Sequence, residues 1–327
     1  MRDFQYVRPK NLDEALEQGQ GARRRFVAGG TLLVDLLRLD VERPESLVDL
    51  NGVLSSDITW DAHGLTIGAG ARNTELAYHD KVMAEMPVLS EALLSGASPQ
   101  LRNMASVGGN LLQRTRCSYF RDVGVDACNK RKPGSGCAAR EGYSRMHAVL
   151  GVSEHCIAAH PSDMCVALLA LDAVVRTRHR SGARELALGD LHILPGDHPE
   201  LETQLKPGEI VTEVFVPSSE RARRSAYVKS RDRASYAFAL ASAAVALELE
   251  GPQIKSARIA LGGVGTKPWR ALEAEAALQG KPATRESFEA AARLTMNGAR
   301  ATSHNAFKLE LAPRVVVAAL TAAGSKS

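Results

Sequence analysis

Four cysteines lie close together in the sequence and have the residue type and spacing of a metal site. Cys117, Cys128, Cys137 and Cys156 are separated by 10, 8 and 18 residues, whereas the fifth cysteine, Cys165, lies in an apolar stretch and is expected in the core. Four thiolates can ligate either a tetrahedral zinc ion or an iron–sulfur cluster. Structural zinc usually binds close Cys-X-X-Cys pairs, which this chain lacks, so the spacing favours a cluster. The alternative is four unrelated, reduced cysteines on a surface loop.

The segment around these cysteines is basic and has no apolar periodicity. Between residues 114 and 142 neither a helical nor a strand pattern is visible. A loop of that length is costly to order unless something holds it. Its cationic side chains are expected to lower the pKa values of the thiols and to offset the negative charge of a cluster. These side chains are Arg114, Arg116, Arg121, Lys130, Arg131 and Lys132.

Two glycine-containing turns have the composition of a phosphate site. Gly29-Gly30-Thr31 lies between a predicted strand and a predicted helix, where glycine lets backbone N–H groups approach an anion and the helix start adds partial positive charge. Residues 106–110 add a hydroxyl, two glycines and an amide. Two such turns could hold the two phosphates of a dinucleotide from opposite sides. Neither is the GxGxxG fingerprint, so ordinary structural turns are the alternative.

Two further polar groups lie near predicted element ends. Residues 160–163, His-Pro-Ser-Asp, precede an apolar helix, and Ser162 or Asp163 is expected to cap it. Asp163 could instead accept hydrogen bonds from a ribose or an adenine edge. Lys229 and Arg231 alternate along a predicted strand, where most cations are simply solvated, although a cation there could stabilise an anionic reduced flavin.

The composition is that of a soluble globular protein with two or three domains. The chain has 327 residues, 45% hydrophobic and 24% charged residues and a formal charge of +4, without a basic run of the kind that binds nucleic acid. No stretch approaches the roughly 18 apolar residues of a membrane span. The N-terminus lacks a signal-peptide core, so we expect a cytoplasmic protein, or a periplasmic one if a signal-bearing partner exports it. No nucleophile triad or HExxH metal pair is visible.

Strands and helices alternate in a way that indicates mixed lobes of helix and sheet. Residues 217–220 are the expected domain boundary. Strands are predicted over residues 25–28, 46–50, 65–69, 173–178, 210–216, 242–249 and 257–262. Helices are predicted from 11 to 19, over 32–39 and 74–96, from Pro161 onward, and over 273–278, 285–297 and 314–323.

Taken in order, these elements resemble the flavoprotein subunits of the xanthine dehydrogenase and carbon monoxide dehydrogenase family of molybdenum enzymes. The resemblance covers almost the whole chain. It is carried by residues 27–33, 98–103, 105–110, 160–163 and 205–209, by Lys229 and Arg231, and by residues 262–265. The cysteine segment, through residues 116–121, 128–131, 133–137 and 156–158, is similar to the branch whose FAD subunit carries an extra [4Fe–4S] cluster, including the periplasmic aldehyde oxidoreductase.

The resemblance implies an α+β protein with a two-lobed FAD-binding domain of the p-cresol methylhydroxylase (PCMH) type. This domain would cover residues 1–217, with lobes of about 1–55 and 56–217 and a [4Fe–4S] loop at 114–157. A smaller α+β domain of the CO-dehydrogenase-flavoprotein type would follow at 221–327. The implied FAD contacts are Phe26, Val27, Ala28, Gly29, Gly30, Thr31, Leu32 and Leu33 around the diphosphate, Ser106, Gly109 and Asn110 opposite, Asp163 at the adenosine end and Lys229 near the flavin ring. The implied cluster ligands are Cys117, Cys128, Cys137 and Cys156.

The implied function is electron transfer within a heterotrimer. A large subunit with molybdopterin would oxidise an aldehyde, and [2Fe–2S] centres on a small subunit would pass electrons to the FAD of this chain and then to an external acceptor. Two alternatives stay open at this point. One is a stand-alone flavin reductase of the same fold, similar to the enolpyruvyl-glucosamine reductases, and the other is a non-catalytic binding module held together by zinc.

Overall fold

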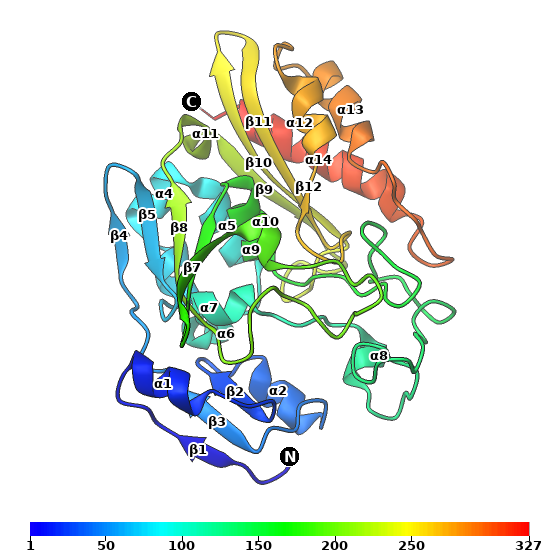
Figure 1. Ribbon diagram of the computed structural model, residues 1–327. Coiled ribbons are helices and arrows are strands. Elements are labelled where there is room, and N and C mark those ends of the chain that lie inside the picture. Colours follow the sequence, from blue (N-terminus) through cyan, green and yellow to red (C-terminus); the bar gives the residue numbers. More distant parts are fainter. Residues whose placement is uncertain (327) are drawn as a thin grey trace.

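The N-terminal lobe is a small parallel sheet with two connecting helices (Figure 1). The computed structural model describes residues 1–326. The strand order of this sheet is β1-β3-β2. Its elements are β1 (Gln5–Val7), α1 (Leu12–Gln18), β2 (Arg24–Val27), α2 (Leu33–Arg38) and β3 (Ser46–Asp49). Asn11 caps α1, because its side chain accepts a hydrogen bond from the N–H of Glu14 at 2.9 Å.

The second lobe combines a five-stranded antiparallel sheet with seven helices. The strand order is β4-β5-β8-β6-β7. The strands are β4 (Ile58–Trp60), β5 (Gly64–Gly68), β6 (Val174–His179), β7 (Gly182–Ala187) and β8 (Ile210–Pro217). The helices are α3 (Asn73–Ala77), α4 (Asp80–Glu85), α5 (Pro87–Ser95), α6 (Pro99–Met104), α7 (Val107–Leu111), α9 (Asp163–Ala170) and α10 (Leu188–Leu191). After its first residue α9 is apolar on every side, and it is correspondingly buried on every side.

The C-terminal part is a four-stranded antiparallel sheet that has helices on both faces (Figure 1). The short helix α11 (Glu220–Arg223) leads into β9 (Ser225–Ser230), β10 (Ala241–Glu250), β11 (Gln253–Gly262) and β12 (Trp269–Arg270). The helices α12 (Leu272–Leu278), α13 (Arg285–Leu294) and α14 (Lys308–Gly324) cover one face, and α5 and α9 of the second lobe cover the other. Side chains alternate across β10, so Ala243 joins the core under α14 whereas Ala244 joins the core of the second lobe. The two parts therefore share a continuous interior.

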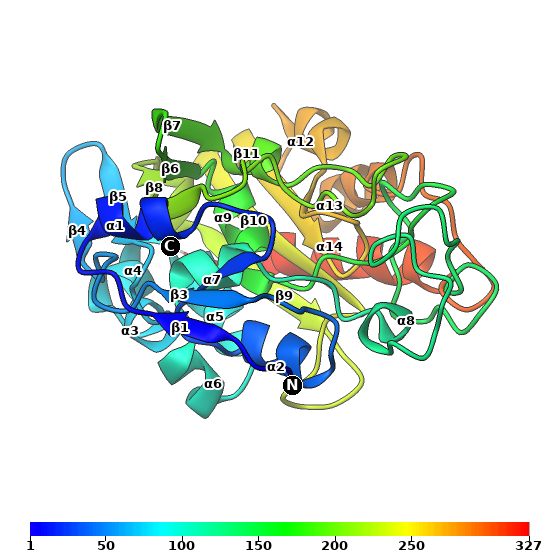
Figure 2. The ribbon, with the colours of Figure 1, turned by 60° about the horizontal axis from the view of Figure 1, so that its bottom comes forward.

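The cysteine loop, defined as residues 114–157, lies at one side of the molecule (Figure 2). Of the helices and strands in residues 1–326, only α8 (Ser118–Arg121) falls within it. The absence of apolar periodicity in this segment therefore predicted its irregular structure correctly. No helix in residues 1–326 is long and apolar enough to cross a membrane.

The predicted α+β class is confirmed, but several predicted elements differ from the structure. The helical stretch expected over residues 74–96 is three helices, and the last break falls at Met86 because Pro87 restricts the residue before it and begins α5. The helix expected from Arg314 begins already at Lys308 and contains Pro313. The sequence did not predict β1, β4 or β7, which are short or largely exposed.

Candidate functional site

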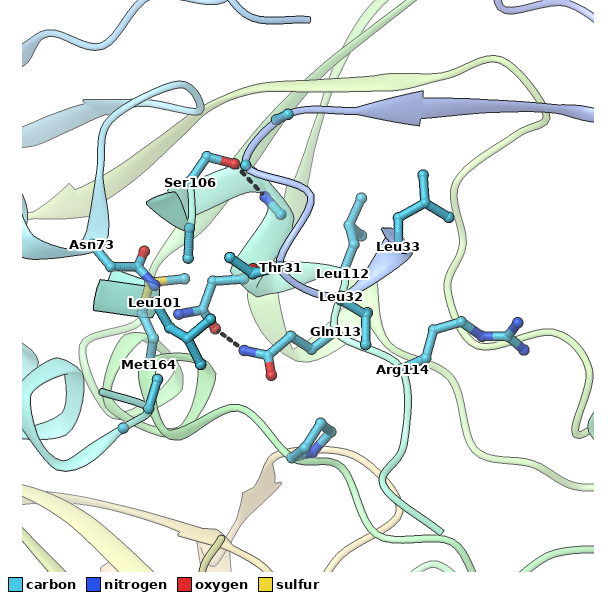
Figure 3. Close-up of a pocket in the computed structure, with 18 of the residues that line it drawn as sticks. Thr31, Leu32, Leu33, Asn73, Leu101, Ser106, Leu112, Gln113, Arg114 and Met164 are labelled. Carbon is cyan, nitrogen blue, oxygen red and sulfur yellow. Dashed lines mark hydrogen bonds between the residues drawn. The ribbon is translucent and has the colours of Figure 1, made fainter. Parts of the chain in front are cut away.

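Both glycine turns line one cavity of about 830 Å³ (Figure 3). It lies where the β2–α2 turn of the N-terminal lobe meets α6, α7 and α9 of the second lobe and β9 of the C-terminal sheet. Every residue that the resemblance implied as an FAD contact lines this cavity. These residues are Phe26, Val27, Ala28, Gly29, Gly30, Thr31, Leu32, Leu33, Ser106, Gly109, Asn110, Asp163 and Lys229.

The first turn depends on its glycines for two different reasons. A Cβ atom on Gly29 would lie 1.9 Å from the carbonyl oxygen of Met104, so only glycine permits the turn to pack against the end of α6. Gly30 has a φ of +70°, which side chains other than glycine rarely adopt. Within residues 1–326, the backbone N–H groups of Thr31 and Leu32 donate to no protein acceptor, and they border the cavity. The turn therefore presents free donors of the kind that hold a phosphate.

The second turn is the start of α7 rather than a β-turn. The Oγ of Ser106 caps the helix by accepting from the N–H of Gly109 at 3.2 Å. The N–H groups of Val107 and Gly108 donate to carbonyls of the segment between β5 and α3, so they are not available to a ligand. The groups left on this side are the hydroxyl proton of Ser106 and the Nδ2 of Asn110, whose Oδ1 already accepts from two side chains.

Two polar side chains in the cavity wall were not predicted from the sequence. Asn73 is 5% exposed, and its Oδ1 is buried without a hydrogen-bond partner among the residues described. Nε of Arg102 is likewise buried without a partner in residues 1–326, although the same side chain donates to the carbonyl of Gly96 at 2.7 Å. Buried polar atoms without partners are rare, and here both side chains border an open cavity, so a polar ligand fits it.

Asp163 and Lys229 form a buried ion pair in this cavity. Nζ of Lys229 lies 2.8 Å from Oδ2 of Asp163, and the hydroxyl of Tyr227 donates to Oδ1 at 2.5 Å. Burial, followed by the charge of Asp163, holds the pKa of Tyr227 well above its usual value. The sequence assigned Asp163 to the adenosine end of FAD and Lys229 to the flavin ring. The two side chains are in contact, so both face the same part of the cavity.

Between these polar groups the cavity wall is apolar. The side chains include Leu50, Leu54, Leu93, Leu112, Met164 and Phe238. FAD has a charged diphosphate between two flat ring systems. The free N–H groups and the partnerless amide and guanidinium atoms suit the polar parts of FAD. The apolar stretches of the wall suit its ring systems, so the residues present fit the cofactor.

The cysteine loop is fastened by side chains whose role the sequence did not reveal. Arg131 donates to the carbonyls of Tyr119, Phe120, Asp122 and Val125 and thereby fixes α8 and the chain that follows. The side chain of Asn129 links two further parts of the loop. Its Nδ2 donates to the carbonyl oxygen of His155 at 3.1 Å, and its Oδ1 accepts from the N–H of Gly136 at 2.8 Å.

Asn129 thereby bridges His155 and Gly136. It is 5% exposed, and it follows Cys128 directly. A β-bridge pairs Cys128 with Cys137. The sequence showed these side chains only as polar residues between cysteines, because their partners lie far along the chain.

The four predicted ligands converge in this loop. Burial raises the pKa of the Cys117 thiol to about 12, and the nearby Cys156 and Cys128 also act to raise it. Burial raises the pKa of Cys156 as well, and Cys137 and Cys128 act in the same direction. Each of these sulfurs is therefore close enough to feel the charge of others. Within residues 1–326, however, no three of them lie within 4.8 Å of one another.

The flanking cations do not lower the pKa values of Cys117 and Cys156 as expected. Burial outweighs them, and only Lys130 acts to lower the pKa of Cys156. Most of these cations are engaged elsewhere: Arg116 and Arg121 both pair with Asp35 of α2. Without a bound metal, the two thiols whose pKa is raised are protonated at neutral pH.

A second group of potential ligands became visible only in the fold. His160, Cys165 and His192 bring their ligand atoms within 4.8 Å of one another, and Nε2 atoms of the two histidines are 3.2 Å apart. Nδ1 of His160, however, accepts from the N–H of Ser162 at 3.3 Å, whereas a metal-bound histidine donates from its second nitrogen. The arrangement thus favours a buried polar network over a metal site. Cys165 is fully buried, as predicted, and Ser162 caps α9.

Comparison with known proteins agrees with this geometry. Residues 2–219 match the family described as FAD binding domain in molybdopterin dehydrogenase, and residues 225–323 match the CO dehydrogenase flavoprotein C-terminal domain. The chain is 49% identical over 333 residues, covering 100% of both chains, to the aldehyde oxidoreductase FAD-binding subunit PaoB of Escherichia coli. It is 29% identical to the glyceraldehyde dehydrogenase medium chain of Sulfolobus acidocaldarius, over 85% of this chain and 82% of the relative.

A solved structure has the same fold. A chain of carbon monoxide dehydrogenase from Hydrogenophaga pseudoflava superposes with a TM-score of 0.77 at 25% identity, over 99% of this chain and 98% of that chain. The fold class and the family inferred from the sequence are thus confirmed. Since the family matches extend from residue 2 to residue 323, this chain is an oxidoreductase flavoprotein and belongs to the FAD-binding subunits of the molybdenum hydroxylases.

Proposed function

We propose that this chain is the electron-transferring subunit of a molybdenum-dependent aldehyde oxidoreductase and that it holds a [4Fe–4S] cluster beside its FAD. The observation that carries the proposal is the full-length likeness to the E. coli aldehyde oxidoreductase subunit. When bound, the flavin accepts and releases electrons, while the protein supplies binding, distance and electrostatics. No residue of this chain has a catalytic role of its own in this proposal.

In this proposal, different cavity residues contact different parts of the FAD. Residues 26–33 hold the diphosphate through the free N–H groups of Thr31 and Leu32. On the other side the Ser106 hydroxyl and Asn110 Nδ2 hold it, and Gly109 lines the cavity between them without a side chain. Asp163 and Lys229 act together at a single place on the cofactor, since they form one ion pair. Asn73 joins the set, because its orphaned Oδ1 needs a donor from the ligand.

Cys117, Cys128, Cys137 and Cys156 ligate the cluster. The chain lacks the close Cys-X-X-Cys pairs that usually bind structural zinc, which favours a cluster of several irons over one zinc ion. The four thiolates would replace four thiols, two of which burial keeps protonated in the free chain, so cluster binding releases protons.

The chain works beside partner subunits in this proposal. A molybdopterin-binding large subunit oxidises the aldehyde, a small subunit with [2Fe–2S] centres carries the electrons, and an external acceptor receives them from this chain. Tyr236 and Phe238 line the cavity and are still 54% and 39% exposed, as suits residues that a partner covers. The domain division at residues 217–221 belongs to the same proposal, and so does export to the periplasm together with a signal-bearing partner.

The test is a visible spectrum with iron and flavin analysis on protein purified anaerobically from its native host. We expect flavin bands on a broad iron–sulfur shoulder that dithionite bleaches, and co-purification of two further subunits. A colourless, zinc-containing protein would support the binding module instead. A yellow, iron-free protein that is active alone would support the stand-alone flavin reductase.

A further inference from the structure

A lysine is buried in the first turn of α14 without an acidic partner. Lys308 is 0% exposed, and its Nζ donates to the carbonyl oxygens of His147 at 2.9 Å and Gly263 at 2.7 Å. Among residues 1–326 it forms no ion pair. Burial, together with the charge of Arg145, lowers the pKa of Lys308 to about 7. A buried cation of this kind is costly, so a role beyond packing is indicated.

The lysine lies directly behind a histidine of the cysteine loop. The segment that leads into α14 runs beside this loop in both views (Figures 1 and 2), and Ser144 and Thr302 are hydrogen-bonded at 2.6 Å. His147 is 4% exposed, and its Nε2 lies 3.1 Å from Sγ of Cys117. Nδ1 of this histidine is buried without a partner among the described residues, so its one polar side-chain contact is the sulfur.

The protonation of this contact follows from the roles of the two atoms. A cysteine that binds iron is a thiolate and can only accept a hydrogen bond. The proton therefore lies on Nε2, and His147 donates to the Cys117 sulfur.

We infer that His147 and Lys308 tune the reduction potential of the proposed cluster. A bound cluster would gain one negative charge when it takes up an electron from the [2Fe–2S] centres of the small subunit. An N–H donor to a ligand sulfur and a cation behind it stabilise that added charge, the more so in a buried site. Both therefore raise the reduction potential. This inference rests on the proposed function.

The test is a redox titration of the full chain at pH 6, below the pKa of about 7 of Lys308, with reduction of the cluster followed by electron paramagnetic resonance. His147→Phe removes the donor, His147→Gln keeps an N–H group, and Lys308→Met removes the charge while filling a similar volume. His63→Phe is the matched control, because that side chain is exposed in the turn between β4 and β5. We expect His147→Phe and Lys308→Met each to raise the ratio of oxidised to reduced cluster at a fixed potential about 3- to 10-fold, the scale of one hydrogen bond.

The outcomes separate this inference from the proposal beneath it. Wild-type chain without iron would overturn both. Wild-type chain with about four irons, together with unchanged potentials in His147→Phe and Lys308→Met, would overturn the tuning role alone. If His147→Phe loses its iron, the potentials of Lys308→Met and His147→Gln decide. A lowered potential in Lys308→Met with a near-normal one in His147→Gln supports the inference, and two normal potentials contradict it.

Discussion

At the scale of single residues, the tightest approach in the FAD cavity lies at Gly29. Gly29→Ala puts a methyl group against the Met104 carbonyl, which must push the β2–α2 turn away from α6. We expect the purified variant to lose most of its FAD, measured as the ratio of flavin to protein. Gly189→Ala is the control, because its new Cβ would meet only an ordinary contact at 3.5 Å. Normal flavin content in Gly29→Ala would mean that the turn does not hold the diphosphate.

The cluster proposal makes an equally local prediction. Cys128→Ser replaces a ligand sulfur by a weaker oxygen ligand, so we expect loss of iron and of the broad absorption shoulder, and lower solubility. Cys165→Ala removes the one cysteine outside the set, a fully buried core residue, and should leave the iron content unchanged. Equal iron in both variants would remove Cys128 from the ligand set.

The sequence predicted the site best where backbone shape dictates residue type. Gly29 and Gly30 stand out because only glycine tolerates such a close approach or such a φ. Asn73 did not stand out, since a buried amide without a partner looks like any helix-start asparagine until the fold is known. The same holds for Tyr227, which reaches Asp163 of α9 from strand β9.

At the scale of elements, Glu209 joins three strands of the second lobe. Burial alone would raise the pKa of its carboxyl, but Arg184 of β7, Thr177 of β6 and the N–H of Lys206 outweigh burial and lower it to about 2. A depressed pKa stabilises the fold above the unfolded value near 4.5, and this stability is lost as pH falls from 4.5 towards 2. We expect roughly 2–3 kcal/mol of unfolding free energy to disappear over that window.

The measurement is chemical denaturation at a series of pH values. Glu209→Gln keeps the shape but loses the charge, so it should be less stable than wild type at pH 7 and show a flatter decline in acid. Parallel curves for the two proteins below pH 4.5 would show that the acid sensitivity comes from other groups.

Element boundaries were harder to predict than element types. Proline was a good marker where it starts a helix, as at Pro87, and a misleading one at Pro313, which α14 accommodates inside its second turn. The edge strands β1 and β4 have three residues each and little apolar alternation, so only pairing with a neighbour reveals them.

At the scale of the whole molecule, Arg114 ties the N-terminal lobe to the second lobe. It pairs with Glu42 on one side and Glu202 on the other, and it lies over the ring of Phe120. Arg114→Ala leaves two largely buried carboxylates without this partner, and we expect a loss of about 1–3 kcal/mol in stability together with weaker FAD retention. A double-mutant cycle with Glu42→Gln should show coupling between the two positions in thermal unfolding. Strictly additive effects would argue that the ion pair does not join the lobes.

How the three sheets pack was beyond the reach of the sequence. The apolar run of α9 predicted burial, but not that the alanine-rich β10 would lie against it with a second layer of helices behind. An alanine in a strand indicates only that other elements pack closely against it. Which elements these are depends on the whole fold.

The ion pair between Asp163 and Lys229 has a consequence for how the protein matures. Asp163 is synthesised well before Lys229 and Tyr227, its two partners, which both belong to the last third of the chain. A nascent polypeptide that still lacks β9 can display both glycine turns, yet one side of the cofactor's chamber remains open to water. Flavin capture should therefore wait until the last third of the chain is being made, and chains truncated before β9 should emerge from the ribosome colourless.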